Sequence, residues 1–295
     1  MTLSIRIVVL NYNGDALLPQ CLPSIAEAAE VAPYPTKITV LDNQSPEESG
    51  LKYVRENFPQ VTIAEAFKNN FLCSYNEYLR KVSEPVVILL NNDIKVQRDF
   101  IEPMARHFVE DPLCFMVSPR CMSWDGRRFE AGRAKAGFRL GFFWCSNQYP
   151  GYENDQEIPG PTAASGFGAF SREKFLELGG YDERFLPGIM EDVDLCIRAA
   201  AKGYHLLYEP RSAVQHLGQA SFKKAFGVKG IQVLAWRNNF LFVWKNGRGI
   251  QFWLSHLFFT PLRIFATLLR GNTVVLQGFL QALQERGKTC QTRKI

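Results

Sequence analysis

Clusters of carboxylate and amide side chains follow three apolar segments in the first third of the chain. Asn11 and Asn13 follow the first segment, Asp42 the second, and Asn92 and Asp93 the third. If these segments are parallel strands, their carboxyl ends meet at one sheet edge, where ligands bind in open α/β folds. Each cluster alone is typical of a turn. Three clusters at one edge predict a nucleotide cleft. The sequence has no GxGxxG motif after the first segment and no Walker A loop, which disfavours a dinucleotide enzyme and a P-loop kinase.

Asp93 is the best placed of these residues to hold a metal ion. It closes residues 86–93, which begin with an apolar run typical of a strand buried on both faces. Mg²⁺ and Mn²⁺ accept one or two carboxylates and take their other ligands from phosphate and water. A second protein ligand has to come from elsewhere, and His216 is a candidate because imidazole tolerates Mn²⁺. Spacing alone favours the alternative that His216 is a buried structural histidine.

A second acidic cluster opens a helical pattern near residue 190. Glu191 and Asp192 fall in its first turn, where carboxylates complement the helix macrodipole. The functional alternative is an ionised carboxylate aimed into a cleft, which a general base for a hydroxyl nucleophile requires. The next acid, Asp194, stands four residues before Arg198, a spacing typical of a surface ion pair.

The elements that position these residues alternate between strands and helices over the first 110 residues. Short β-branched runs predict strands, and apolar residues on one face predict the intervening helices. This alternation predicts an α/β fold with a mostly parallel sheet and right-handed crossovers. The predicted strands are 5–10, 37–41, 61–65 and 86–90, and the predicted helices are 16–30, 47–57 and 74–82.

The pattern is less regular from residue 111 to 165, where we expect a partly irregular segment near the site. Helices are predicted again at 172–178 and 191–202, followed by a short strand at 205–208. The composition, 46% apolar and 21% charged, excludes a disordered chain. Seven scattered cysteines form no CxxC pair and no signal peptide is evident, which argues against a disulfide framework and favours the cytoplasm.

The charge divides the 295 residues into two regions. The whole chain carries a net charge of +5, but residues 223–295 contain twelve Lys/Arg and one acid, a net charge of +11. The first 222 residues then carry a net charge of −6. We therefore expect a catalytic domain at 1–222 and a basic, aromatic, helical region at 223–295. Such asymmetry favours an anionic partner for the tail.

The most apolar stretch is residues 250–269. A membrane span is disfavoured because Arg263 near a bilayer centre would cost ~2.5–3.5 kcal/mol. Two alternatives stay open: an amphipathic helix lying at a membrane interface with Arg263 and Arg270 among the headgroups, or a helical pair that caps the catalytic domain. The predicted lipid-facing residues are Trp253, Leu257, Phe258, Ile264, Phe265 and Leu268.

Taken together, these motifs resemble the family 2 glycosyltransferases of the GT-A fold, particularly bacterial rhamnosyltransferase-like members, over residues 5–246. The matching segments are Val8–Gly14, Leu41–Ser45, the metal motif Asn91–Asp93, Ser165–Phe170, Gly179–Glu183, the acidic motif Glu191–Leu195, the late histidine motif at His216, and Arg237–Asn246. The family usually has Gly at the position of Phe71, and Asn91 stands where an Asp is often seen.

The resemblance implies a GT-A (Rossmann-like), mostly parallel sheet flanked by helices, and an inverting transfer of a sugar from a nucleoside diphosphate to a hydroxyl. It implies that Asp192 is the base, that Asp93 and His216 hold Mg²⁺ or Mn²⁺, and that Glu191 and Gly166 line the acceptor or donor-sugar region. Donor binding falls to Asn11, Asn13, Asp42, Asn69 and Asn92.

The resemblance also implies partners. These are a dTDP- or UDP-sugar, with rhamnose favoured, and a polysaccharide or polyprenyl-diphosphate-linked glycan. The basic tail adds an anionic membrane surface, which would place the protein on the cytoplasmic face of the inner membrane. Three alternatives are a catalytically silent nucleotide-sugar-binding subunit, a sugar-phosphate nucleotidyltransferase and a nucleic-acid binder. A nucleotidyltransferase would need a cationic Gly-rich loop, and residues 11–14 of this chain offer no cation. Nucleic-acid binding is disfavoured.

Overall fold

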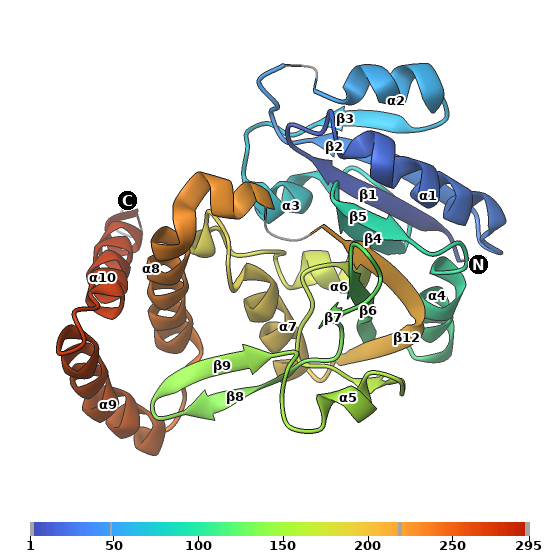
Figure 1. The fold of residues 1–295 in the computed structure, drawn as a ribbon. Coiled ribbons are helices and arrows are strands. Elements are labelled where there is room, and N and C mark those ends of the chain that lie inside the picture. Colours follow the sequence, from blue (N-terminus) through green and yellow to red (C-terminus); the bar gives the residue numbers. More distant parts are fainter. Residues whose placement is uncertain (1–2, 48, 218–219, 293–295) are drawn as a thin grey trace.

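The computed structural model describes residues 3–47, 49–217 and 220–292 and has a mixed α/β architecture (Figure 1). Four parallel strands form one half of its large sheet in the spatial order β3-β2-β1-β4. They are β1 (Ile5–Asn11), β2 (Thr36–Asp42), β3 (Thr62–Glu65) and β4 (Val86–Asn91). These strands confirm the prediction within two residues at each end. Their carboxyl ends lie at one edge of the sheet.

The other half of the sheet is mixed. β11 (Gly168–Ser171) lies antiparallel between β4 and β6 (Cys114–Ser123), and β12 (His205–His216) runs parallel to β6. Three short strands extend the sheet by antiparallel pairs: β5 (Ile94–Val96) and β10 (Gly160–Pro161) on β12, and β7 (Phe129–Ala131) on β6.

The prediction of a partly irregular segment at 111–165 missed most of its strands. This segment contains β6, β7, the hairpin of β8 (Lys135–Arg139) and β9 (Phe142–Ser146), α5 (Tyr152–Asp155) and β10. The predicted short strand at 205–208 was also too short, because β12 continues along β6 through a register shift after Glu209. Strand pairs of this kind join distant parts of the chain and leave a weak local pattern.

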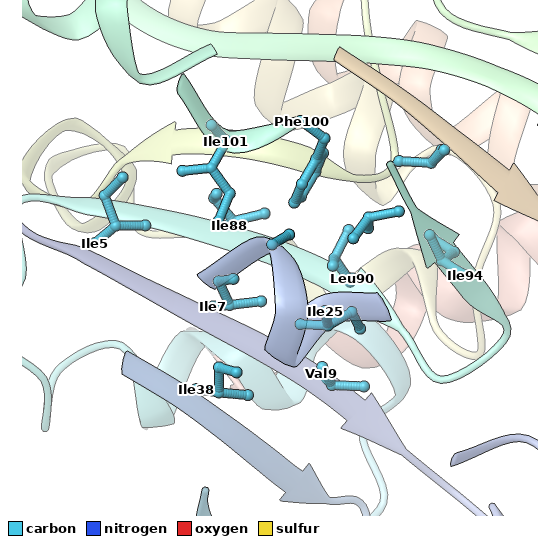
Figure 2. Close-up of a cluster of buried hydrophobic side chains, with 14 of the residues drawn as sticks. Ile5, Ile7, Val9, Ile25, Ile38, Ile88, Leu90, Ile94, Phe100 and Ile101 are labelled. Carbon is cyan, nitrogen blue, oxygen red and sulfur yellow. The ribbon is translucent and has the colours of Figure 1, made fainter. Parts of the chain in front are cut away.

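Both faces of the sheet are buried. Alternate residues of β1 and β4 point to opposite faces, so Ile7 and Ile88 join one cluster while Val8 and Val87 join the other. Figure 2 shows the first cluster, which α1 (Leu18–Val31), α2 (Leu51–Asn57) and α4 (Ile101–Glu110) cover. The second is covered by α3 (Ser74–Tyr78), α6 (Arg172–Glu177) and α7 (Glu191–Ala201). A sheet covered on both faces explains its continuous apolar strands.

Three helices follow the sheet: α8 (Ala220–Asn246), α9 (Ile250–Leu268) and α10 (Val274–Thr292). They pack beside the β8–β9 hairpin, away from the large sheet (Figure 1). The turn of the hairpin meets α9 closely, because a Cβ on Gly141 would lie 2.4 Å from the backbone of His256. No helix in the described ranges is both long enough and apolar enough to cross a bilayer.

Candidate functional site

A buried network of amides and a carboxylate occupies the carboxyl edge of β1, β2 and β4. Asn11 donates its side-chain N–H to Asp42 Oδ1 at 2.8 Å and accepts a hydrogen bond from Asn92 at 2.8 Å. Ser45 donates to Asp42 through its hydroxyl at 2.7 Å and its backbone N–H at 3.0 Å. The three predicted residues Asn11, Asp42 and Asn92 therefore form one connected group.

Asn69 belongs to an adjoining group that the loop after β3 supplies. Its Oδ1 accepts hydrogen bonds from the Asn43 amide at 2.9 Å and from the Phe71 backbone at 3.2 Å. Ser74 donates to Asn43 Oδ1 at 2.6 Å. Phe71, which opens the 3₁₀ turn η1 (Phe71–Cys73), has a φ of +49°. A left-handed backbone is strained in a residue other than glycine.

Asn13 is positioned through its backbone, since its N–H donates to Ser45 Oγ at 3.0 Å while its side chain is exposed. The next residue has to be glycine. A Cβ on Gly14 would lie 1.9 Å from Asn11 Oδ1, so any side chain there would displace the Asn11 amide from the network.

Asp93 and His216 face each other across the end of the sheet. β5 follows Asp93 and pairs with the end of β12, which brings His216 Nε2 to 3.4 Å from Asp93 Oδ2. Asp93 Oδ1 is buried and has no hydrogen-bond partner. Although burial opposes the charged imidazolium, the carboxylates of Asp93 and Glu130 raise the pKa of His216.

This donor set fits a hard divalent cation. Two ligand atoms in neighbouring positions of an octahedral ion with bonds of about 2.1 Å lie about 3 Å apart, close to the Asp93–His216 separation. The unpartnered oxygen of Asp93 supplies a further ligand atom. An oxygen and an imidazole nitrogen are ligands that Mn²⁺ accepts.

Glu191 and Asp192 lie in the first turn of α7. Glu191 is buried, and burial together with the charge of Asp192 raises its pKa to about 8. Burial also raises the pKa of the Asp192 carboxyl, against a hydrogen bond that its Oδ1 accepts from the Val193 N–H at 2.8 Å. Asp192 Oδ2 faces Gly166, where a Cβ would lie 3.1 Å away. The predicted pair Asp192 and Gly166 are therefore neighbours.

Phe167 and its neighbour Gly166 lie between His216 and Asp192. The Phe167 ring centroid lies 6.2 Å from that of His216, and the preceding residue, Gly166, lies against Asp192. Hydrogen bonds join Asp42, Asn11 and Asn92, and Asp93, the next residue along the chain, faces His216. The Phe167 ring and its neighbour Gly166 then connect His216 with Asp192. All ten predicted site residues lie at one end of the large sheet.

The loop before α7 is held by α8. The amide of Asn238 donates to the backbone oxygens of Phe185, Gly188 and Ile189 at 2.9, 2.8 and 2.7 Å. The loop follows the 3₁₀ turn η2 (Glu183–Phe185), and its last two residues, Ile189 and Met190, have φ values of +73° and +81°. Such strain persists only where the surroundings enforce it, and these two residues directly precede the first turn of α7, which carries Asp192.

The prediction that Asp194 and Arg198 form a surface pair was wrong. Asp194 is fully buried and accepts hydrogen bonds from Arg198 and Lys245 at 2.8 and 2.7 Å. Lys245 also donates to Asp182 at 2.7 Å, and hydrogen bonds from Arg184 and Lys245 hold the pKa of Asp182 far below its ordinary value despite burial. The helix spacing was correct, but α8 covers the pair in a way that no local pattern reveals.

A cavity of about 750 Å³ lies beside the amide network, and its lining does not include Asp93, His216 or Asp192. Its walls include Ala66, Lys68 and Asn70 on one side and Gly180 and Glu183 on the other. Asn43, Ser45, Glu130 and Asn238 were not among the predicted site residues. The first two are ordinary turn residues by sequence, and the last two act through tertiary contacts that spacing does not report.

The architecture is that of the GT-A fold. The structure of GalNAc-T7 with UDP, GalNAc and Mn²⁺ superposes with a TM-score of 0.58 at 18% identity, over 73% of this chain and 44% of that one. A mannosyltransferase from Pyrobaculum calidifontis, in complex with GDP-Man and Mn²⁺, superposes with a TM-score of 0.56 at 18% identity, over 96% of this chain and 75% of that one.

The family model described as glycosyl transferase family 2 matches residues 6–179, which is more than half of the chain. The protein therefore belongs to glycosyl transferase family 2. The N-acetylglucosaminyl-diphospho-decaprenol L-rhamnosyltransferase of Mycobacterium tuberculosis is 24% identical over 240 residues, 73% of this chain and 76% of that protein. A putative polypeptide N-acetylgalactosaminyltransferase 10 of Drosophila melanogaster is 24% identical over 230 residues, and the chain spans 36% of its length.

Proposed function

We propose that this glycosyltransferase moves a sugar, with rhamnose favoured, from a UDP- or dTDP-sugar to a hydroxyl of a lipid-linked or polysaccharide glycan, with inversion at the anomeric carbon. Support comes from the similarity to the mycobacterial rhamnosyltransferase over most of both chains. We divide the chain into a catalytic unit at 1–222 and a C-terminal helical unit at 223–295.

In this proposal Asp192 removes the proton of the acceptor hydroxyl as that oxygen attacks the anomeric carbon and the diphosphate leaves. A positioned base contributes about 10²–10⁴-fold. Asp192 lies against Gly166, where any side chain would crowd its carboxylate, and the pKa of the neighbouring Glu191 is raised by burial and by the charge of Asp192.

The donor is held at the amide network. Asp42, Asn11, Asn13, Asn69 and Asn92 would bind the base and ribose, and the adjoining cavity offers room for the nucleoside end. Asp93 and His216 would hold Mg²⁺ or Mn²⁺, which neutralises the charge that builds on the leaving diphosphate.

The observation that carries this proposal is the placement of Asp42, Asp93 and Asp192 along one connected group of residues, joined by the contacts of Asn11, Asn92, His216 and Gly166–Phe167. The test is a panel of UDP-, dTDP- and GDP-sugars, with and without Mn²⁺, assayed for donor hydrolysis and for a rise in Tm. Turnover of one donor that needs Mn²⁺ supports an enzyme. Stabilisation by a donor that is never turned over, even with glycan acceptors, supports the alternative of a silent nucleotide-sugar-binding subunit.

An anionic membrane surface on the cytoplasmic side is the proposed second partner, and α9 is the proposed contact. One face of α9 packs on the hairpin and α8, burying His256 and Thr260, while Arg263 lies over the rings of Phe142 and Trp236. The opposite face is an exposed apolar stripe at helical spacing: Ile250, Leu254, Leu257, Phe258, Leu262, Phe265 and Leu269.

The packed face of α9 fits the alternative of a helix that caps the catalytic domain, and its exposed apolar face fits the alternative of a helix at a membrane interface. Of the residues expected to face lipid, Trp253 and Ile264 are half-buried, and Arg263 is engaged with aromatic rings, because the helix turns that side toward the hairpin. Leu257 and Phe258 are 66% and 62% exposed. Exposed Arg248 and Arg270 lie at the two ends of α9, which has no acidic residue. This pattern fits a helix lying in an anionic interface.

The membrane contact is tested by co-sedimentation with phosphatidylglycerol and phosphatidylcholine vesicles. We expect salt-sensitive binding to the anionic vesicles only, and loss of binding in the double variant Leu257→Ser, Phe258→Ser. The variant Val109→Ser, which changes an exposed apolar residue on α4, is the control and should bind as wild type. Unchanged partitioning of the double variant contradicts the proposal, and a dimer disrupted by the same variant points to a second copy as the partner.

A further inference from the structure

Glu130 lies on the far side of His216 from Asp93. It sits on β7, which pairs with β6 beside Cys121, and its Oε2 is 3.5 Å from His216 Nδ1. Asp93 Oδ2 is 3.4 Å from the other ring nitrogen, Nε2. The imidazole therefore lies between two carboxylates, one at each nitrogen, and the Phe167 ring lies beside it.

The two ring nitrogens cannot serve the same ion, because their lone pairs point away from each other. Asp93 has the buried oxygen without a partner, so a cation belongs on the Nε2 side of the ring. A neutral imidazole that binds a cation through Nε2 carries its hydrogen on Nδ1, where it needs an acceptor. Glu130 Oε2 is the carboxylate oxygen that faces this nitrogen.

We propose that Glu130 is a positioning residue, which accepts a hydrogen bond from His216 Nδ1 and so presents Nε2 toward the cation. This inference rests on the proposed metal site. Carboxylates that hold a ligating histidine in this way orient the ring and raise its basicity, and their loss typically weakens metal binding 10–100-fold.

The competing arrangement makes Glu130 a direct ligand. Glu130, His216 and Cys121 offer ligand atoms that all lie within 4.8 Å of one another. That set contains a sulfur and would favour a soft ion such as Zn²⁺, whereas a nucleoside diphosphate is bound with Mg²⁺ or Mn²⁺. The orphaned Asp93 oxygen would then stay unused. The arrangement that uses Asp93 is therefore the better supported one.

The test compares Glu130→Ala and Glu130→Gln with Glu153→Gln, which removes one carboxylate from an exposed position on α5. Mn²⁺ affinity is measured by EPR, with and without UDP. We expect Glu130→Ala to weaken it 10–100-fold, Glu130→Gln to lose less because its amide oxygen still accepts the N–H, and Glu153→Gln to match wild type. Circular dichroism and Tm establish that the variants fold.

A second readout needs no metal. Nitrogen-15 NMR of histidine-labelled protein at a pH where the ring is neutral reports the tautomer of His216, assigned with His216→Gln. We expect the Nδ1–H fraction to fall in Glu130→Ala and to recover in Glu130→Gln. An unchanged tautomer in Glu130→Ala overturns the proposal. Mn²⁺ affinity that falls equally in Ala and Gln variants, with Zn²⁺ bound more tightly than Mn²⁺ by wild type, indicates the direct ligand instead. Failure of wild type to bind Mn²⁺ with UDP refutes the metal site itself, and the tautomer still tests Glu130.

Discussion

Replacing Asn238 by leucine removes the clamp that α8 places on the loop before the proposed base. Asn238 is fully buried, and its amide serves three backbone oxygens. Phe185 O keeps the Gly188 N–H as a partner at 3.0 Å, so Gly188 O and Ile189 O are the two carbonyls left without the amide. An unsatisfied buried polar group costs about 1–3 kcal/mol. Asn238→Leu should therefore destabilise the protein by about 3 kcal/mol.

The loss of stability in Asn238→Leu should be concentrated in the loop before α7 and in the first turn of α7. A local loss of about 3 kcal/mol corresponds to roughly 100-fold faster amide exchange where opening is local, since each 1.4 kcal/mol is a factor of ten. We expect this at residues 188–194, where the Asp194 N–H donates to Met190 O at 2.8 Å. The strained backbone at Ile189 and Met190 would relax and shift Asp192, so donor hydrolysis should fall as well.

The assay is hydrogen–deuterium exchange with mass spectrometry, together with thermal unfolding and donor hydrolysis. Asn239→Leu is the matched control, because Asn239 makes one hydrogen bond to Phe143 O on β9 at 2.7 Å and none to the loop. The control should lose stability without faster exchange at 188–194. Equal exchange in that segment for both variants would refute the assignment of Asn238 as the clamp.

Three further predictions concern the acids of the site. Asp192→Asn should lower transfer by about 10²–10⁴-fold with Tm and donor binding retained, and full turnover would remove Asp192 from the role of base. Burial and the charge of Asp192 raise the pKa of Glu191 to about 8 in the folded protein. The stabilisation by its neutral form is therefore complete below the pKa of the unfolded chain and is lost as the pH rises toward 8. Thermal unfolding from pH 5 to 9 should therefore show Glu191→Gln gaining Tm over wild type with rising pH, and parallel curves would contradict the burial argument. Asp93→Ala should abolish the Mn²⁺-dependent part of nucleotide binding in calorimetry, and an unchanged metal requirement would exclude it as a ligand.

Local sequence determined the strands that carry the donor-side residues. β1, β2 and β4 are short β-branched runs that end in Asn or Asp. Because both faces of these strands are buried, their sequences are nearly continuous apolar runs. Parallel strands then bring their carboxyl ends together whatever the detailed packing. For this reason Asn11, Asp42 and Asn92 could be predicted as neighbours from sequence alone. The resemblance to the GT-A fold needed these segments together with the later motifs, up to residue 246.

Tertiary structure decided what the remaining residues do. His216 reaches Asp93 because β12 extends past its local pattern and pairs with β5, and Glu130 reaches His216 from a strand that the sequence did not reveal. Asp194 is buried because α8 covers it. One apolar face of α9 is exposed because the helix packs its opposite face against the β8–β9 hairpin. Each outcome depends on contacts between segments far apart in the chain. Spacing along the sequence reports only neighbours along one helix or strand.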